Sequence, residues 1–337
     1  MGWYGRKVAR YERMRWEQEP NRRTLPFAWG LEHIGGNAED PDPRGFLGQF
    51  VGQTLASSDK WFAANPADNY ALEDGVLTFS SQIASPWHEN NRVHAQFFPG
   101  TTPGAAVVVL AQWNAKWEEQ QAVCRWLNKL GLTAVKLSLP YHDRRSIPGH
   151  PRGDHLIGPN IGLTLQANRQ AVLDVRRTLR WLEQRGYTRL AVLGTSIGSC
   201  IAFITMCHEP AIRAGAFLHV STFFGDVVSR GLTTLNVWDP MKEYVTREEA
   251  TRYWSPISPF EYIRKLHGAG KKILAITGRY DPTFPRELTD QFLDELRRND
   301  VAFSHMPLPC GHYSLGVPPF SHAVGYRFGT FLRKALS

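Results

Sequence analysis

Cysteine is scarce in this sequence. Only four of its 337 residues are cysteine, and Cys124, Cys200, Cys207 and Cys310 form neither a CxxC pair nor a spacing that suits zinc. Cys200 and Cys207 fall on one predicted helix about 10 Å apart along its axis, which is too far for a disulfide between them. We therefore expect reduced thiols that pack as small apolar side chains, and no bound metal.

Long apolar runs are missing as well. No hydrophobic stretch is long enough to span a membrane, and the N-terminal region lacks the apolar segment of a secretion signal. Gly2 is not followed by the Ser or Thr of a myristoylation motif. Neither internal repeats nor low-complexity segments are visible. These absences predict a cytoplasmic globular protein, and its length suits one α/β domain with additions.

Charge is unevenly distributed along the chain. The formal net charge is +8, and residues 1–23 contribute about half of it with seven basic and three acidic side chains. Elsewhere the basic residues are scattered and no nucleic-acid motif appears, so we expect no nucleic-acid partner. Tyr4, Val8, Tyr11 and Met14 recur at helical spacing, which predicts a helix packed on its own domain. Docking on an anionic membrane surface or on a partner is the alternative.

The most informative segment that is present is Gly194-Thr195-Ser196-Ile197-Gly198. It follows a strand-like run from Arg189 and precedes an apolar helical stretch that ends at Met206. This context predicts a nucleophile elbow, in which the serine stands on a strained bend and the glycines admit close backbone neighbours. The N–H of Ile197 then lies where it can hold a developing oxyanion. A serine that only caps the following helix is the alternative.

A carboxylate and an imidazole follow the serine in the order that nucleophilic catalysis needs. Asp281 leaves a strand-like run through a turn, and His312 lies in a loop after the last strand-like run. His305 falls inside that strand and His322 opens the last helix, so His312 is the better placed base. A serine hydroxyl is nearly un-ionised at neutral pH, so an imidazole must take its proton and a carboxylate must orient that imidazole. The alternatives are an Asx turn at Asp281 and a solvent-exposed loop histidine.

With Ser196, Asp281 and His312 in this order, the chain resembles the α/β-hydrolase superfamily over roughly residues 75–337. The resemblance implies a mostly parallel eight-stranded sheet flanked by helices, and a serine acyl hydrolase that needs no cofactor. The segment Leu139-Pro140-Tyr141-His142 further resembles esterase-type members. Many members have His-Gly after the third strand. This chain has Gln112 and Trp113 there, so the backbone N–H of one of them is expected to complete the oxyanion hole.

Residues 1–70 are predicted to form an extension packed on the core, and residues 71–337 the hydrolase domain. Alternating strand and helix patterns predict a parallel core with its site at the carboxyl ends of the strands. The predicted strands are Val76–Ser80, Arg92–Phe98, Ala105–Leu110, Leu132–Leu139, Thr188–Gly194, Ala214–Val220, Lys272–Gly278 and Val301–Met306.

Two long connections are candidates for substrate contacts. Residues 221–259 are rich in aromatic side chains, and we expect a small cap in which Phe224 and Trp238 contact the substrate. The loop after the fourth predicted strand offers His142 and Arg144 to an anionic head group, with a solvated turn or a structural Asp–Arg pair as the alternative.

Together these features predict a serine hydrolase that cleaves carboxylic esters through an acyl-enzyme. The expected substrate is a small-molecule or lipid-like ester. An acyltransferase or a serine peptidase would use the same triad with another acceptor or bond. A non-catalytic binding module is disfavoured, because such a protein would normally have lost a member of the triad and all three residues are present.

Overall fold

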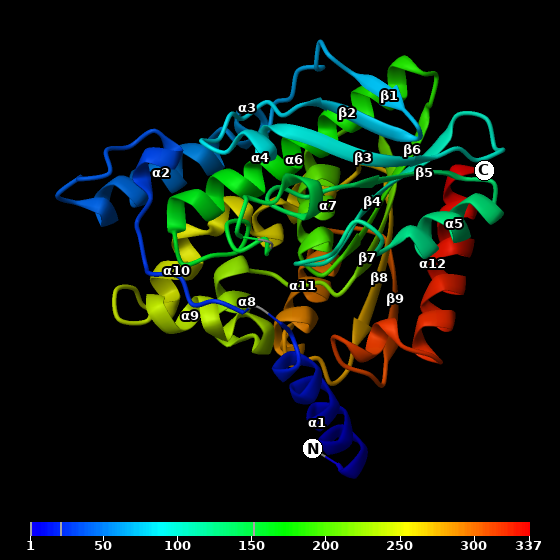
Figure 1. Cartoon of the computed structure of the whole chain (residues 1–337). Helices are drawn as coiled ribbons and strands as arrows, with labels where there is room; N and C mark the ends of the chain where they lie inside the picture. The colour runs from blue at the N-terminus through cyan, green and yellow to red at the C-terminus, as the bar shows by residue number, and fades with distance from the viewer. Residues whose placement is uncertain (1, 21, 151) are drawn as a thin grey trace.

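The computed structural model describes residues 2–20, 22–150 and 152–337. Over these residues it contains one sheet of nine strands in the order β1-β2-β3-β5-β4-β6-β7-β8-β9. Pairing is antiparallel from β1 through β3 to β5 and parallel across the rest of the sheet (Figure 1). The strands are β1 (Ala71–Glu73), β2 (Val76–Ser80), β3 (Arg92–Phe98), β4 (Ala105–Leu110), β5 (Thr133–Leu137), β6 (Arg189–Thr195), β7 (Ile212–Leu218), β8 (Lys272–Gly278) and β9 (Phe303–Leu308).

All eight predicted strands are present, with ends that differ by at most two residues. The predicted number of eight is corrected to nine, because β1 pairs with β2 at the edge of the sheet. This strand is only three residues long, so it is too short to display the alternation that identifies a strand in a sequence.

Helices cover both faces of the sheet (Figure 1). The α-helices are α1 (Trp3–Glu17), α2 (Pro43–Ala56), α3 (Ser58–Trp61), α4 (His88–Asn91), α5 (Gln121–Lys129), α6 (Ile161–Gln184), α7 (Ile197–His208), α8 (Phe224–Arg230), α9 (Leu235–Met241), α10 (Arg247–Tyr253), α11 (Arg286–Arg298) and α12 (Phe320–Leu336). The 3-10 helices are η1 (Leu31–Ile34), η2 (Asp143–Arg145), η3 (Leu232–Thr234), η4 (Ser255–Ile257), η5 (Pro259–Leu266) and η6 (Ser314–Gly316).

Strand β4 shows why its whole run is apolar. Ala106 and Val108 belong to the core shared with α6, α7 and α11, whereas Val107 and Val109 belong to the core shared with α5 and α12. Successive side chains of a strand point to opposite faces, so a strand covered on both sides is apolar throughout. Packing on both faces of the sheet therefore fixes the positions of the carboxyl ends of these parallel strands.

The segment before β1 packs on the domain mainly through its later part. Leu31, Leu47 and Phe62 are buried in the core that contains α6. Helix α1 packs through part of its predicted face: Val8 is buried, and the Tyr4 hydroxyl donates to the Pro309 carbonyl at 2.8 Å. Met14, at the other end of that face, is exposed.

Between β7 and β8 the chain forms three 3-10 helices, η3, η4 and η5, and three short α-helices, α8, α9 and α10. Val237, Tyr253 and Trp254 are buried there, so the segment has a packed interior. Among the helices described, none is both long and apolar enough to cross a membrane.

Candidate active site

Ser196 lies on a sharp bend between β6 and α7, with φ 56° and ψ −120°. Residues other than glycine rarely adopt such backbone angles, which cost about 1–3 kcal/mol. A Cβ at Gly194 would lie 2.3 Å from the carbonyl oxygen of Gly198, and one at Gly198 would lie 2.5 Å from that of Leu110. Both glycines are therefore required by close backbone packing. The Ser196 N–H donates to the carbonyl of Leu218 at 2.8 Å and ties the bend to β7.

Asp281, His312 and Ser196 form a continuous chain of short contacts. His312 Nδ1 lies 2.9 Å from Asp281 Oδ2, and His312 Nε2 lies 3.0 Å from Ser196 Oγ. These distances fit a ring that donates from Nδ1 to the carboxylate and accepts the serine proton at Nε2. The structure thus brings the three predicted residues together from positions up to 116 residues apart.

The other oxygen of Asp281 is held by the backbone. Oδ1 accepts hydrogen bonds from the N–H groups of Thr283 and Phe284, at 2.8 and 2.9 Å. The carboxylate therefore makes the turn bonds that an Asx turn requires and also faces His312 with Oδ2. Burial would raise the pKa of Asp281, but the imidazoles of His312 and His219 outweigh it and hold that pKa well below its usual range.

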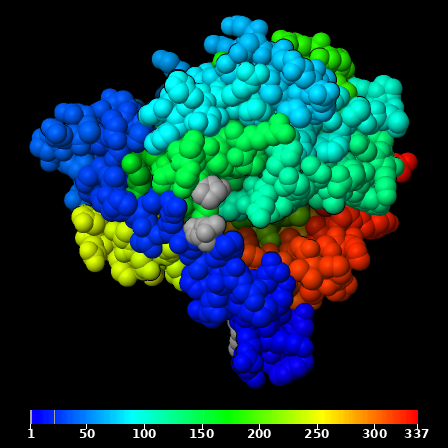
Figure 2. Space-filling view, in the orientation of Figure 1, coloured from blue at the N-terminus to red at the C-terminus, as the bar shows by residue number. Residues whose placement is uncertain are grey.

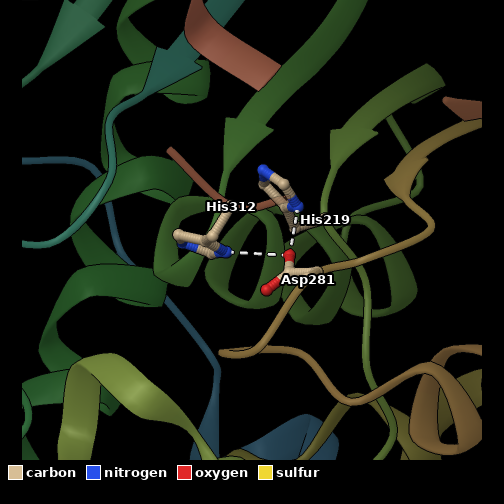
Figure 3. A group of neighbouring side chains, drawn as sticks. All are labelled: His219, Asp281 and His312. Atoms are coloured by element: carbon tan, nitrogen blue, oxygen red, sulfur yellow. Dashed lines mark hydrogen bonds and ion pairs between the residues drawn. The ribbon is translucent and has the colours of Figure 1, made fainter. Parts of the chain in front are cut away.

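His219 is a site residue that the sequence analysis missed. Its Nδ1 lies 2.7 Å from Asp281 Oδ2, the oxygen that also faces His312 (Figure 3). The rings of His219 and His312 stack with their centroids 4.2 Å apart. His219 directly follows β7 with φ 64°, at the edge of the sheet where active sites gather. The predicted strand Ala214–Val220 extended past this position and so concealed it.

The two imidazoles have opposite electrostatic environments. Burial disfavours the charged ring of His312, but the adjacent Asp281 carboxylate outweighs burial and raises its pKa above the ordinary value of 6.5. For His219, burial and then the charge of His312 lower the pKa. His312 is accordingly the ring that accepts a proton, and His219 is its neutral neighbour.

Glu12 is the second residue that sequence reasoning missed. This carboxylate of α1 is fully buried against the loop that contains His312. It accepts hydrogen bonds from the N–H of Tyr313 at 2.7 Å and from the N–H and hydroxyl of Ser314 at 3.0 and 2.6 Å. A Cβ on Gly311 would lie 2.5 Å from the Glu12 carboxyl carbon. The first helix of the chain therefore braces the histidine loop.

Two cavities meet at Ser196. The smaller has a volume of about 60 Å³ and is walled mainly by apolar side chains, among them Ile157, Phe224, Val228 and Phe284. The larger has a volume of about 1450 Å³. Its lining is mixed in charge and includes these residues: Arg15, Glu19, Lys116, Glu119, Asp143 and Arg152. The serine thus lies between a small apolar space and a large space with a mixed lining.

The three residues predicted to donate to the oxyanion, Ile197, Trp113 and Gln112, differ in how they are placed around the cavities at Ser196. Ile197 is the first residue of α7, so its N–H has no partner within the helix. Trp113 borders both cavities, whereas Gln112 borders only the larger one. The Gln112 side chain is engaged with Glu119 and Gln120. Trp113 is therefore the candidate that borders both cavities together with Ser196.

Three predicted substrate contacts, His142, Arg144 and Trp238, line neither of the two described cavities. His142 is buried, with Nδ1 2.7 Å from the Pro140 carbonyl and Nε2 accepting the N–H of Asn114, so both ring nitrogens are occupied. Arg144 is exposed and lies over the Trp117 ring at 4.0 Å.

Among the residues that line the two described cavities, His142, Arg144 and Trp238 do not occur, whereas Phe224 lines the smaller one. Trp238 is buried in the core that includes the helices between β7 and β8. His142 instead holds Asn114, the residue next to Trp113, and so positions the loop after β4.

His219, Asp281 and His312 also offer one ligand atom each within 4.8 Å, which is the geometry of a small metal site. Both Nδ1 atoms already face one carboxylate oxygen, and His312 Nε2 faces the serine. A metal would have to displace these contacts and the Nδ1 protons. The two hydrogen bonds of His312 and the close contact of His219 with Asp281 therefore account for the cluster without ligation.

Known proteins resemble this chain in sequence profile and in fold. The sequence profile of the prolyl oligopeptidase family matches residues 150–314, a range that contains Ser196, Asp281 and His312. No curated protein matches the chain.

Solved structures show the same fold at low sequence identity. An esterase of Pyrococcus furiosus is 15% identical and aligns over 82% of this chain and 96% of its own, with a TM-score of 0.56. An acylaminoacyl peptidase of Pyrococcus horikoshii is 11% identical and aligns over 80% of this chain and 44% of its own, with a TM-score of 0.57. A puromycin-hydrolyzing peptidase of Mycobacterium tuberculosis is 14% identical and aligns over 73% and 37%, with a TM-score of 0.55.

Proposed function

We propose that the chain is a serine hydrolase of the α/β-hydrolase superfamily, and that it cleaves carboxylic esters through an acyl-enzyme on Ser196. The supporting observation is the unbroken contact chain from Asp281 through His312 to Ser196, on a strained bend that opens into two cavities. Each of the three groups has the partner that its proposed role requires.

In this mechanism Ser196 Oγ attacks the ester carbonyl while His312 Nε2 takes its proton. The carbonyl oxygen becomes an oxyanion, which the backbone N–H groups of Ile197 and Trp113 receive. His312 then returns the proton to the leaving alcohol. A water molecule then attacks the acyl-enzyme: His312 takes the proton of the water and afterwards returns it to Ser196. Asp281 stabilises the imidazolium in both steps.

The two cavities favour a division of the substrate. The apolar walls of the smaller cavity suit a short acyl group, since each buried methylene is worth about 0.8 kcal/mol. The larger cavity suits a bigger and more polar alcohol portion, because charged and amide side chains line it. In this proposal the segment between β7 and β8 is a cap, and Phe224 is its contact with the acyl group.

A serine peptidase is the second candidate. The prolyl oligopeptidase profile and the two peptidase structures favour it, and the larger cavity has room for a peptide. An acyltransferase would share the triad and differ only in the acceptor. The binding-module alternative loses support, because neither of the two contacts of the triad is broken.

Labelling with a fluorophosphonate, followed by peptide mapping, tests the nucleophile. We expect label on Ser196 and a loss of about 10⁴-fold or more in hydrolysis for Ser196→Ala, with the exposed Ser57→Ala as the matched control. Esters and amides that share one acyl group then separate esterase from peptidase. Faster cleavage of the amides would replace the first candidate by the second, and label on another serine would remove Ser196.

A further inference from the structure

Helix α1 presents two opposite sides. Its buried residues lie on one side: Gly5, Val8 and Glu12. With about 100° between successive helical residues, the opposite side carries four residues at spacings of four, three and four. These residues, here named the outward stripe, are Trp3, Lys7, Arg10 and Met14. Trp3 is 70% exposed and Met14 42% exposed, so the stripe has large apolar side chains in contact with solvent.

The stripe is also strongly basic. Lys7 and Arg10 are exposed, and Arg13 beside them is exposed as well. Of the two acidic residues of the helix, Glu12 points the other way and is buried against the histidine loop, and Glu17 is exposed at the last position of the helix. The Lys7 ammonium lies 5.7 Å from the centre of the Trp3 ring, so one cation and one aromatic ring share the surface.

The position of α1 makes the stripe accessible. The helix projects from the body of the molecule as a separate lobe (Figures 1 and 2). Arg15, Gln18 and Glu19, at the end of this helix, line the larger cavity beside Ser196. Met14, the last residue of the stripe, is therefore the sequence neighbour of Arg15, which lines that cavity.

We propose that the outward stripe docks the protein on an anionic lipid surface. Cationic side chains are attracted to anionic head groups, while tryptophan and methionine partition into the boundary between head groups and acyl chains. This mixture of side chains complements a surface in which an apolar layer lies beneath a negatively charged one. A nucleic-acid duplex presents its phosphates outward and keeps its base faces stacked inside, so it leaves Trp3 and Met14 without an apolar surface.

Co-sedimentation of the full chain with vesicles tests the proposal. Phosphatidylcholine vesicles with and without phosphatidylglycerol are compared, in wild type and in Ser196→Ala, in which the proposed nucleophile is absent. We expect binding only to the anionic vesicles, and weaker binding at high salt because screening shortens the Debye length to about 3 Å near 1 M. The measurement reads binding and not turnover, so its failure is distinguishable from failure of the proposed ester hydrolysis.

Two variants test the stripe itself. Lys7→Gln with Arg10→Gln should weaken binding about thirtyfold, a factor of about five for each basic side chain. Trp3→Ala should weaken it about fivefold while the salt dependence stays the same. The matched control is Arg286→Gln with Arg298→Gln, two exposed arginines of α11 outside the stripe, which should bind as wild type does.

Three results would overturn the proposal. The first is equal binding to neutral and anionic vesicles, and the second is an equal loss of binding in the α11 control. The third is a double variant that changes oligomer size in gel filtration, or abolishes binding to a DNA duplex, while vesicle binding by wild type is absent. That result would assign the stripe to a second copy of the chain or to nucleic acid.

Discussion

Nδ1 of His219 lies 2.7 Å from Oδ2 of Asp281. That oxygen is also the partner of His312 Nδ1, so one carboxylate oxygen serves two imidazoles while its neighbour Oδ1 is held by two backbone N–H groups. Each contact restricts rotation of the carboxylate and favours its charged form. His219 is therefore a positioning residue that acts on His312 through Asp281.

Replacing His219 tests this role. His219→Asn keeps an N–H near the position of Nδ1 and tolerates the positive φ, so it should retain most of the activity. His219→Phe removes the donor and should lower kcat about ten- to a hundredfold on a small ester, as expected for one hydrogen bond to a charged group. Equal kcat values for the two variants would assign His219 to packing alone.

The pH dependence of hydrolysis follows from His312. The ring accepts the serine proton only when it is neutral, and its neutral fraction grows as the pH rises through its pKa. Burial lowers that pKa but Asp281 raises it more, so kcat/KM should rise with a midpoint above 6.5. Asp281→Asn should move the midpoint to lower pH and reduce kcat about 10⁴-fold. A pH–rate profile of both proteins checks this, and an unshifted midpoint in the variant would contradict it.

Glu12 links the first helix to catalysis. Glu12→Gln keeps the size of the side chain but places an amide N–H₂ among donors, so at least one hydrogen bond to Tyr313 or Ser314 is lost. We expect a lower melting temperature, from a loss of about 1.5–3 kcal/mol, and a lower kcat. The midpoint of the pH profile should also fall, because the charge of Glu12 helps to raise the pKa of His312.

Glu17→Gln provides the control, since Glu17 is exposed on the same helix. It should leave kcat, the pH midpoint and the melting temperature unchanged. If Glu12→Gln lowered only the melting temperature, the brace would be structural and would have no effect on His312.

Acyl-chain preference tests the smaller cavity. Phe224→Ala removes part of the wall and so enlarges the cavity. The preferred acyl group should therefore become longer by a few methylenes, each worth about 0.8 kcal/mol. Trp238→Phe changes a buried aromatic ring of the same insertion that does not line the cavity, and should alter only the melting temperature. Rates on acetyl through octanoyl esters compare the two. An unchanged profile in Phe224→Ala would place the acyl group elsewhere.

Local patterns in the sequence were enough to predict the elbow and most of the sheet. The glycines around Ser196 are required by close backbone contacts, some with residues a few positions away and one with Leu110 at the end of β4. A strand covered on both faces, such as β4, is apolar whatever its partners are. The order of Ser196, Asp281 and His312 follows the strands that place them. These features are recorded in spacing and periodicity, which one chain displays by itself.

Tertiary structure alone decided the rest of the site. A single histidine or glutamate has no periodicity, and the contact of His219 with Asp281 or of Glu12 with Tyr313 joins segments 62 and 301 residues apart. His142 and Trp238 have the residue types of substrate contacts, but packing turned the first toward Asn114 and buried the second. Whether a polar or aromatic side chain contacts the substrate or packs inside the protein depends on which distant segments fold against it. Only the tertiary structure decides this.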